Sequence, residues 1–532
     1  MATSIDSTFS LIKNKFTIEC LSENQKKSIQ TVLDKKDVFI CTKTGSGKSL
    51  SYESVPVIVS DPVCVLIIAP LNSIMDEQKK KLEGFGFRCA VIHSGQEDID
   101  VKAVKFIFTS PEIAVGDTKL RKQFYTTEFK ETLKLIVVDE AHTVLQWGES
   151  HEGNDPFREY FSRIGELRSV FLNVPVMALT ATASPLKRKR IMKSLCLNDC
   201  VTILDSPDRT NIKISTSKIS NISKAQDYFT PLLDDVETQK DSYPRTLIFC
   251  TLINDCAKVY IYFLERFGRQ STLFNMYHSE TKDYVNASIR EDMNLENGNI
   301  RVLICTNVAG MGVNFRGVQQ IIHYGLPRDM DTFVQQMGRA GRDGTLSHEI
   351  ILMKMIGSHL KTVEPFLLNL CKNTEQCRHK LLCDAYLCKH EQIIPKHNCC
   401  DICELQCSCG SVDCRVKHPL LRDTGKLDDE EESRHQMNTD ISDDDKRILR
   451  LRLECLQSNL KEESDDMFST LSDSAIDDIM INCSVILKPA DVLIYATCWA
   501  YPVAVQVCEI LNNVIGDRDL SESEGEEVAG LE

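Results

Sequence analysis

The stretch that decides the fold is Thr42-Lys43-Thr44-Gly45-Ser46-Gly47-Lys48-Ser49. It follows the apolar run Val38–Cys41, so the sequence places it in a turn from a buried strand to a helix. Glycines in such a turn let backbone N–H groups approach phosphate oxygens. The ε-ammonium of Lys48 is then placed to reach the β- and γ-phosphates of a nucleotide, and the hydroxyl of Ser49 to hold Mg²⁺. The predicted nucleotide-binding residues of this loop are Thr44, Gly45, Ser46, Gly47, Lys48 and Ser49. One departure is that Thr42 replaces the first glycine of the general pattern.

A second chemical segment, Asp139-Glu140-Ala141-His142, follows the apolar run Leu135–Val138. A carboxylate at the end of a strand can hold Mg²⁺ through its water shell, which is the role expected of Asp139. Glu140 is placed to orient and deprotonate an attacking water molecule. The pair thus predicts hydrolytic chemistry on the nucleotide.

A third segment runs from Gln335 to Gly344 with the sequence QQMGRAGRDG. Arg339 and Arg342 are three residues apart and share one face if the segment is helical. One of them could neutralise charge on a transferring γ-phosphoryl group. Because this segment follows the second by more than one domain of ~150 residues, two domains are expected to form opposite walls of one nucleotide site.

Apolar runs with the length of central parallel strands occur in two series. The fold class predicted from them is α/β, with two tandem doubly wound parallel-sheet domains, followed by a small cysteine-rich segment and an acidic, partly helical C-terminal region. The expected boundaries are 1–207, 208–365, 366–415 and 416–532. The expected strands are Val38–Cys41, Val63–Ile68, Phe106–Thr109, Leu135–Val138, Val174–Leu179, Thr246–Cys250, Leu273–Tyr277, Val302–Cys305, Gln320–His323 and Glu349–Met353.

The net charge of −15 is concentrated near the C-terminus. Residues 416–532 hold 11 Lys+Arg against 27 Asp+Glu, a net of −16, which leaves +1 for residues 1–415. A near-neutral region can still present a basic channel to a polyanion. The acidic region is expected to aid solubility, with binding to a basic partner as the alternative.

The N-terminus lacks an apolar signal region, and the most lipophilic stretch, Val492–Val507, is interrupted by Pro502. We therefore expect no membrane association and a reducing compartment, in which cysteines are thiols or metal ligands. Ten of the 23 cysteines fall between Cys371 and Cys414.

Taken together, these segments resemble helicase superfamily 2, and within it the RecQ-like DNA helicases. The resemblance covers roughly residues 10–405, and it implies that the two doubly wound domains are RecA-like and that residues 366–415 form a small helical zinc-binding module. The residues that carry it are LSENQKKSIQ (21–30), TGSGKS (44–49), APLNSIMDEQ (69–78), TSPE (109–112), DEAH followed by QWG (146–148), MALTATAS (177–184), YHSET (277–281), CTNVAGMGVN (305–314) and QQMGRAGRDG.

The resemblance implies an ATP- and Mg²⁺-dependent helicase that moves 3′ to 5′ on single-stranded DNA and opens duplexes in repair, recombination or replication. Its implied catalytic residues are Lys48, Asp139, Glu140, Gln335, Arg339 and Arg342, with Thr180–Thr182 coupling hydrolysis to movement. Gln25 would read adenine. The implied DNA-binding residues are Pro70, Ser110, Trp147, Phe157, Arg158, Thr306 and Asn307.

Two departures from the family bear on this expectation. Positions that usually hold Tyr and Arg near the adenine motif carry Ile18 and Ser22, which predicts relaxed adenine selectivity. About five extra residues separate Trp147 from Phe157 and Arg158, in a loop thought to couple DNA to hydrolysis. An RNA-directed motor, or a weakly hydrolysing nucleic-acid-binding adaptor, therefore stays open as an alternative.

The cysteine-rich segment resembles the zinc module of the family. Cys400 and Cys403 form a metal knuckle, and Cys377 followed by Arg378 matches the first ligand of the family. For the fourth ligand, His397 is favoured over Cys399, because adjacent thiolates seldom bind one ion; Cys388 is a third option. Cys407, Cys409 and Cys414 are expected to be reduced thiols, with a second ion as the alternative.

Beyond Cys414 the sequence offers an acidic linker and helical segments, with little sign of the winged helix common in RecQ enzymes. The basic run Lys187-Arg188-Lys189-Arg190 could serve as a nuclear signal or simply face solvent on a helix. A DNA-directed enzyme is expected in the nucleus, with the cytoplasm as the alternative.

Overall fold

The computed structural model describes residues 5–43, 45–93, 99–148, 158–219, 225–310, 315–354, 362–415, 418–421, 442–463, 471–483, 486, 492 and 501–515. The chain divides into two compact units, Met1–Ser220 with Phe229–Leu421, and Asn221–Tyr228 with Arg422–Glu532. Each unit is described by itself. The first unit contains two parallel sheets, which we call the first lobe (up to Leu204) and the second lobe (from Ile212 to Leu421).

The first lobe is built on a seven-stranded sheet in the order β3-β4-β2-β5-β6-β1-β7. All neighbouring strands are parallel. The central strands are covered on both faces, which is why they read as continuous apolar runs in the sequence. The strands are β1 Val38–Cys41, β2 Cys64–Ile68, β3 Cys89–Val91, β4 Phe106–Thr109, β5 Leu133–Val138, β6 Val176–Thr180 and β7 Val201–Leu204.

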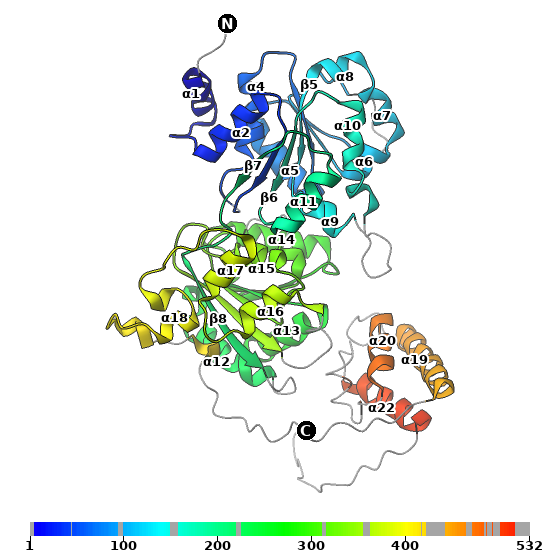
Figure 1. The fold of residues 1–532 in the computed structure, drawn as a ribbon. Helices are drawn as coiled ribbons and strands as arrows, with labels where there is room; N and C mark the ends of the chain where they lie inside the picture. Colours follow the sequence, from blue (N-terminus) through cyan, green and yellow to red (C-terminus); the bar gives the residue numbers. More distant parts are fainter. Residues whose placement is uncertain are drawn as a thin grey trace. The chain divides into compact units, whose positions relative to one another are not determined.

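Helices cover both faces of this sheet (Figure 1). Residues on alternate positions of β1, β2 and β5 point to opposite faces and join two separate hydrophobic clusters. One cluster includes α2 Glu23–Leu33, α3 Leu50–Glu53, α4 Val55–Ile58 and α5 Asn72–Gly84. The other includes α6 Pro111–Gly116, α7 Thr118–Phe124, α8 Thr127–Thr132, α9 Thr143–Gln146, α10 Leu167–Val170 and α11 Pro185–Ser194. The N-terminal helix α1 Ile5–Phe16 packs beside α4.

The second lobe is built on a six-stranded sheet in the order β10-β11-β9-β12-β13-β8, again parallel throughout. Helix α13 Ile253–Phe267 lies against β9, β10 and β11. The strands are β8 Ile212–Ile219, β9 Arg245–Cys250, β10 Phe274–Tyr277, β11 Val302–Cys305, β12 Val318–Tyr324 and β13 Ser347–Lys354. The remaining helices before the cysteine-rich segment are α12 Ala225–Gln239, α14 Asp283–Asn294 and α15 Met330–Met337.

The cysteine-rich segment shares one hydrophobic core with the second sheet. Its elements are α16 Pro365–Lys372, α17 Arg378–Tyr386, the 3₁₀ turn η7 Lys396–Asn398 and α18 Asp401–Leu405. Leu382, Cys400 and Ile402 belong to the same cluster as Leu247 and Ile351 of the strands. Backbone contacts reinforce the join, since the N–H of Ile214 donates to the carbonyl of Cys399 over 3.1 Å. The predicted module is thus continuous with the second lobe.

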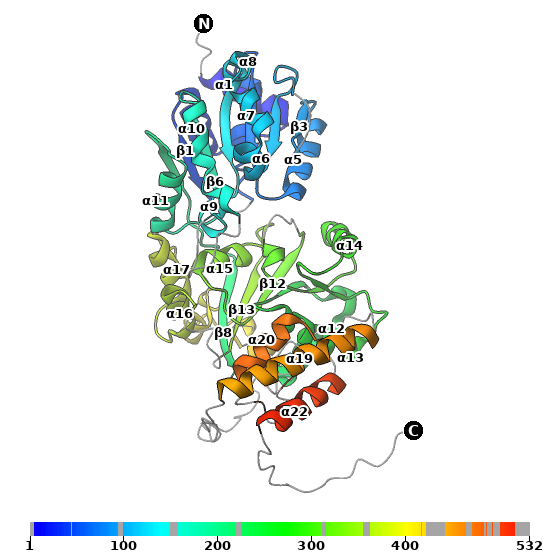
Figure 2. The ribbon, with the colours of Figure 1, turned by 90° about the vertical axis from the view of Figure 1, so that its right-hand side faces the viewer.

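The second unit is helical in its described residues: α19 Asp443–Glu463, α20 Asp473–Asn482 and α22 Tyr501–Ile515. Helices α20 and α22 contact α19 through a small core that includes Leu453, Ile479 and Val507 (Figures 1 and 2). The sequence prediction of helical segments up to about residue 514 agrees with this. The predicted acidic linker, 423–445, lies mostly outside the described residues. Within the described part of the chain, no helix combines the length and apolar composition that crossing a membrane requires.

The predicted fold class of two doubly wound domains is confirmed. All ten predicted strands are present, with ends displaced by at most two residues. Three further strands, β3, β7 and β8, were not predicted. All three lie at sheet edges or are short, so they lack the continuous apolar runs of central strands.

Candidate nucleotide site and cysteine clusters

The glycine-containing loop connects the end of β1 to α3. Gly45 and Gly47 have φ angles of +83° and +75°, a left-handed conformation that side chains disfavour. The Nζ of Lys48 donates to the carbonyl of Thr42 over 2.7 Å and so folds back across the loop. Burial lowers the pKa of Lys48, while the nearby carboxylates of Glu140 and Asp139 oppose this shift. A buried ammonium held in this way is prepared to exchange its carbonyl partner for a phosphate oxygen.

Gln25 lies directly against this loop. Its amide nitrogen donates to the carbonyl of Gly47 over 3.1 Å, and its amide oxygen accepts from the N–H of Ser22 over 2.9 Å. A Cβ at position 47 would come within 2.6 Å of the Gln25 amide nitrogen, so the Gln25 side chain would have to move away from the loop. Each amide atom of Gln25 still has one hydrogen-bonding position available for adenine. Thr44, the other predicted nucleotide contact in this region, lies outside the described residues.

The carboxylates of the second motif follow β5. Asp139 is partly buried, and desolvation together with the charge of Glu140 raises its pKa to about 7. Glu140 has a φ of +48°, and its N–H donates to the Asp139 carboxylate over 2.9 Å. A strained conformation at a non-glycine residue is typical of functional positions. Two adjacent carboxylates at the end of a strand are oxygen ligands of the kind that Mg²⁺ takes in proteins.

A line of polar contacts leads from Glu140 to the second lobe. Nδ1 of His142 lies 3.3 Å from the Glu140 carboxylate and 3.2 Å from the Thr180 hydroxyl. The Thr180 hydroxyl donates to the carbonyl of Thr182 over 2.9 Å. The Thr182 hydroxyl in turn donates to the carbonyl of Asp331 over 3.4 Å. These contacts connect Glu140 to the first turn of α15.

Asp331 is held firmly at this junction. Its carboxylate lies 2.7 Å from the Nζ of Lys187 on α11 and accepts from the Tyr386 hydroxyl over 2.6 Å. Lys187 also approaches Asp329, 3.4 Å away. Burial acts to lower the pKa of Lys187, but these carboxylates outweigh it and leave the pKa raised. Lys187 of the basic run is therefore engaged in the fold.

The two arginines of the third motif follow α15. Arg339 is 7% exposed, and burial lowers its pKa while the Glu140 carboxylate opposes the shift. Burial and the charges of Arg339 and Arg209 lower the pKa of Arg342 to about 9, and Glu140 again opposes the shift. Gln335, on the same helix, is 5% exposed.

The three motifs share one electrostatic environment. Glu140 acts on Lys48, Arg339 and Arg342, and the charge of Arg342 acts on Lys48. Lys48, Glu140, Arg339 and Arg342 therefore lie close enough to influence one another's charge within the first unit. The convergence of Lys48, Asp139 and Arg342 on one triphosphate stays a prediction.

Arg158 occupies the centre of the predicted DNA-contacting region of the first lobe. Its guanidinium pairs with Glu112 through two bonds of 2.5 and 2.7 Å and donates to the carbonyl of Pro70 over 2.7 Å. It also lies over the rings of Trp147 and Phe161, at 5.3 and 4.6 Å. Burial would raise the pKa of Glu112, but the Arg158 contacts outweigh it and hold the pKa below its usual value. Arg158 thus connects three segments predicted to contact DNA.

The other predicted DNA contacts lie at the ends of strands. Ser110 precedes α6 and follows β4, and Thr306 follows β11, with its N–H donating to the carbonyl of Tyr277 over 3.2 Å. The amide oxygen of Asn307 accepts from Gln336 over 3.1 Å, which connects it to the helix before the arginines. Phe157 and the extra residues before it lie outside the described residues.

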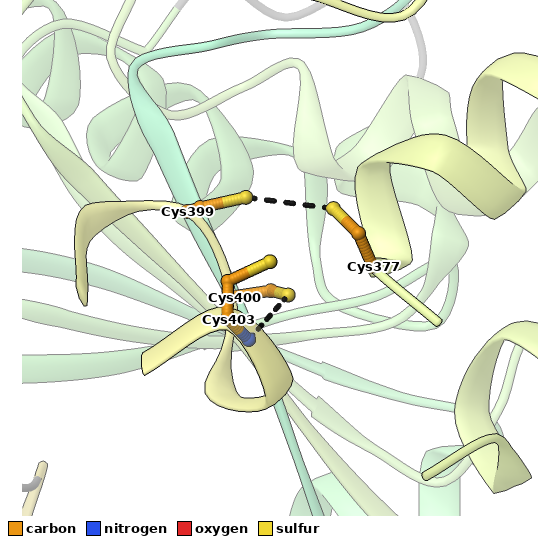
Figure 3. A group of neighbouring side chains, drawn as sticks. All are labelled: Cys377, Cys399, Cys400 and Cys403. Atoms are coloured by element: carbon orange, nitrogen blue, oxygen red, sulfur yellow. Dashed lines mark hydrogen bonds between the residues drawn. The ribbon is translucent and has the colours of Figure 1, made fainter. Parts of the chain in front are cut away.

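Four thiols gather where the cysteine-rich segment meets the second sheet (Figure 3). The sulfur atoms of Cys377, Cys399, Cys400 and Cys403 all lie within 4.8 Å of one another. The sulfurs of Cys377 and Cys399 are 3.5 Å apart, and the N–H of Cys403 donates to the Cys400 sulfur over 3.5 Å. Hydrogen bonds from Cys377 and Cys399 hold the pKa of Cys400 well below its usual value. Four convergent sulfur ligands suit tetrahedral Zn²⁺.

The preference for His397 over Cys399 as the fourth member of this group does not match the geometry. Cys399 has φ −82° and ψ −75°, whereas Cys400 is extended. This bend turns the two neighbouring sulfurs to the same side, which a straight strand would not allow. His397 instead lies with Cys407, Cys409 and Cys414. Cys388, the third option, contacts Ser206 and Cys383.

Sequence reasoning missed several residues of the site. Glu112 and Asp331 were not singled out, although each anchors charged or hydroxyl groups from distant segments. Glu112 stands in the quoted TSPE motif, so its position beside Ser110 was an available signal. No pattern pointed to Asp331, because its partners Lys187 and Tyr386 come from elements far apart in the chain.

Comparison with known proteins matches this architecture. Residues 22–190 match the DEAD/DEAH box helicase family, and residues 227–344 match the helicase conserved C-terminal domain. The chain is 28% identical over 438 residues to the RecQ-like DNA helicase blm-1 of Caenorhabditis elegans, covering 75% of this chain and 42% of that protein. It is 26% identical over 419 residues to the ATP-dependent DNA helicase RecQ of Haemophilus influenzae, covering 74% and 63%.

Among solved structures, the DUF1998 helicase MrfA bound to DNA and AMPPNP has a TM-score of 0.54 at 18% identity, covering 69% of this chain and 52% of that one. This likeness concerns the fold. The chain spans less than two thirds of the length of the relatives named above. The chain therefore carries a DEAD/DEAH box helicase domain and a helicase C-terminal domain in order, and about three quarters of its length is similar to RecQ-like DNA helicases.

Proposed function

We propose that the protein is an ATP- and Mg²⁺-dependent motor that translocates 3′ to 5′ on single-stranded DNA and unwinds duplex DNA. The observation that carries this is the shared electrostatic environment of Lys48, Asp139, Glu140, Arg339 and Arg342. These residues come from both lobes and have the charges that ATP hydrolysis needs. The RecQ-like relatives support DNA as the substrate.

Each residue has a distinct task in this proposal. Lys48 leaves the carbonyl of Thr42 to contact the β- and γ-phosphates, and backbone N–H groups near Gly45 and Gly47 surround the phosphates. Glu140 takes a proton from the attacking water. Arg342 or Arg339 offsets charge on the γ-phosphoryl group as it transfers.

Mg²⁺, when bound with ATP, would neutralise phosphate charge, with Ser49 and Asp139 as its protein partners. The residues fit this ion because Asp139 is a partly buried carboxylate at the end of a strand, next to the carboxylate of Glu140. Gln335 lies on the helix that precedes the arginines and is placed to sense the same phosphates.

In this proposal, contacts within the first unit couple ATP hydrolysis to movement along DNA. The line from Glu140 through Thr180 and Thr182 to Asp331 connects the hydrolytic base to the second lobe. A change in the charge near Glu140 therefore alters contacts between the lobes. Repeated closing and parting of the lobes would move bound strand contacts relative to each other.

The DNA strand would run over the ends of the strands in both lobes. Pro70, Ser110 and Trp147 are the proposed contacts in the first lobe, together with Phe157, and Thr306 and Asn307 those in the second. Arg158 acts as a positioning residue, because its guanidinium is engaged with Glu112, the Pro70 carbonyl and two aromatic rings. Backbone contacts of this kind favour affinity over base sequence.

A structural Zn²⁺ bound by Cys377, Cys399, Cys400 and Cys403 completes the proposal. All four positions are filled by protein ligands, so no site is open for catalysis. The ion would hold the cysteine-rich segment against the second sheet. Metal binding by such a group contributes directly to the free energy of folding.

We propose the nucleus as the location because the proposed substrate is DNA, with the cytoplasm as the alternative, and fluorescence microscopy of the tagged chain tests this. The basic run 187–190 is a weak candidate for the signal, since Lys187 is bound to Asp331. The acidic C-terminal region is proposed to aid solubility.

The decisive experiment compares ATP hydrolysis with single-stranded DNA and with single-stranded RNA of the same sequence. We expect DNA to stimulate turnover at least tenfold and Lys48→Ala to abolish the stimulation. Stimulation by RNA alone would identify an RNA-directed motor, and turnover unchanged by either strand would identify a nucleic-acid-binding adaptor. Forked duplexes with single 3′ or 5′ tails then test polarity, and opening only of 5′-tailed forks would contradict the proposed direction.

A further inference from the structure

A second cluster of metal-ligating side chains lies just after the first. Nδ1 of His397 is 3.0 Å from the sulfur of Cys414, 3.3 Å from that of Cys409 and 3.5 Å from that of Cys407. The sulfurs of Cys409 and Cys414 are 3.0 Å apart, and those of Cys407 and Cys414 are 3.5 Å apart. All four atoms lie within 4.8 Å of one another. One imidazole and three thiols therefore point at a common centre.

The separations are close to those of a tetrahedral zinc site. Zn–S and Zn–N bonds of about 2.3 and 2.0 Å place neighbouring sulfurs about 3.8 Å apart and a sulfur about 3.5 Å from the ring nitrogen. The observed values of 3.0 to 3.5 Å need an outward shift of a few tenths of an ångström. Three soft thiolates and one imidazole form a ligand set that Zn²⁺ occupies in structural sites.

The local backbone brings the four residues together. His397 lies in η7 and is 6% exposed, so its ring is fixed by the fold. The N–H of Cys407 donates to the carbonyl of Glu404 over 2.9 Å, which continues the end of α18. Gly410 then turns the chain with a φ of +74°, returning it so that Cys414 meets Cys409. The turn is short and leaves Cys407 and Cys409 on the side of His397.

The two clusters use different residues and share none. The first takes Cys377, Cys399, Cys400 and Cys403, and only Asn398 separates His397 from Cys399 in the chain. Each cluster offers four ligands, which is the full complement of a tetrahedral ion. The sequence expectation of reduced thiols at 407, 409 and 414 did not include His397, because that residue was assigned to the first cluster.

We propose that His397, Cys407, Cys409 and Cys414 bind a second Zn²⁺ ion with a structural role. The ion joins η7 to the segment that follows α18. It fixes the path of the chain through residues 407–414, where backbone hydrogen bonds are sparse. The first cluster uses other ligands: Cys377 directly precedes α17, Cys399 directly follows η7, and Cys400 and Cys403 lie at the start of α18.

The test is the zinc content of the full chain, purified under reducing conditions and measured by mass spectrometry of the metal. We expect two zinc ions per chain. Cys409→Ser with Cys414→Ser should lower the content to one, whereas Cys455→Ser, an exposed thiol on α19 outside both clusters, should leave it at two. Two ions in the double variant, or a single ion in the unaltered chain that the double variant keeps, would overturn the proposal.

Replacement of zinc by Co²⁺ provides a readout that needs no variant. Two occupied sites contain seven thiolate ligands, so their sulfur-to-cobalt charge-transfer absorption should be about 7/4 times that of one site with four thiolates. The second site should also add the visible bands of a cobalt ion with mixed nitrogen and sulfur ligands. Absorption of four thiolates alone contradicts the second site. A chain 2 Da lighter that holds one ion identifies a Cys409–Cys414 disulfide instead and also overturns the proposal.

The two zinc assignments can be tested independently, because each cluster can be disrupted without changing the ligands of the other. Cys377→Ser with Cys403→Ser removes the ion of the first cluster and leaves the second ligand set intact. If the unaltered chain holds one ion that this variant loses and the Cys409/Cys414 variant keeps, the first assignment stands and the second is wrong. The reverse pattern would support the second cluster alone.

Discussion

The hydroxyl of Thr182 in the first lobe donates to the main-chain carbonyl of Asp331 in the second, over 3.4 Å. Through Thr180 and His142 this bond is continuous with Glu140, the proposed base. Asp331 in turn begins the helix that leads to the arginines. Four polar contacts thus connect Glu140 to the hydrogen bond between the two lobes.

Replacing Thr182 by Val should separate hydrolysis from movement. Val has a similar shape but lacks the hydroxyl, so the bond to Asp331 is lost while packing is retained. We expect DNA-stimulated ATP turnover to stay within about threefold and strand opening to fall about tenfold. Thr182→Ser keeps a hydroxyl and serves as the control. Equal loss of both activities would point to a purely structural role.

Arg342→Ala should abolish most of the chemical step without weakening nucleotide binding. A guanidinium that offsets transition-state charge contributes about 10³-fold or more to turnover. We therefore expect kcat to fall about 10³-fold and KM to change less than threefold, measured by steady-state kinetics with saturating DNA. Arg163→Ala, whose side chain pairs with Glu166 at the surface, is the matched control. A rise in KM with unchanged kcat would assign Arg342 to ground-state binding.

The pKa of Asp139, raised to about 7, predicts a pH-dependent response to Mg²⁺. In the absence of the ion, the folded chain holds this proton more tightly than the unfolded chain, so stability falls as the pH rises from about 4 to about 7. Mg²⁺ requires the ionised carboxylate, so its affinity with ATP should be about tenfold weaker at pH 6 than at pH 8.

Thermal unfolding with and without Mg²⁺ and ATP at the two pH values measures this effect. The side chain of Asp139→Asn cannot titrate, so Mg²⁺ with ATP should give this variant the same small stabilisation at both pH values. A response to Mg²⁺ that is independent of pH in the unaltered chain would mean that Asp139 is ionised throughout this range.

Arg158→Ala should destabilise the first lobe and weaken DNA binding together. The substitution leaves the partly buried carboxylate of Glu112 without its two-bond partner, at a cost of about 1–2 kcal/mol. Urea unfolding measures this cost, and Arg163→Ala, at an exposed pair, should cost less than about 1 kcal/mol. Arg158→Lys retains charge but not the planar pairing and should restore part of the stability. Unchanged DNA affinity in Arg158→Ala would remove its positioning role.

The sequence was sufficient for features that depend on local pattern. Central strands are buried on both faces, so runs such as Val302–Cys305 were recognisable by composition alone. The loop at Gly45 and Gly47 could be predicted because its conformation restricts residue type. Edge strand β8, by contrast, alternates apolar and polar residues, and its Lys213 pairs with Glu404 from the cysteine-rich segment. That pairing depends on chain folding over nearly 200 residues, which no local pattern records.

The ligand sets of the cysteine clusters show the same limit. Spacing favoured His397 for the first cluster, because it preserves an interval of three residues to Cys400 and on to Cys403. The structure instead favours Cys399, because the backbone bend at this residue turns its sulfur toward Cys377. Backbone angles at one residue thus determine which cluster His397 joins.

The contact between the cysteine-rich segment and β8 has a consequence for shortened forms of the protein. Strand β8 is the last in its sheet, and its outer backbone groups bond to this segment, with Ile214 donating to Cys399 and Thr216 donating to the Asp401 carboxylate. A chain that ends before Cys371 would leave these backbone N–H and C=O groups without hydrogen-bond partners from this segment. Exposed strand edges of this kind pair with strands of other chains. Proteolysis or alternative splicing that removes the segment would therefore yield a product prone to self-association, even though both motor lobes remain.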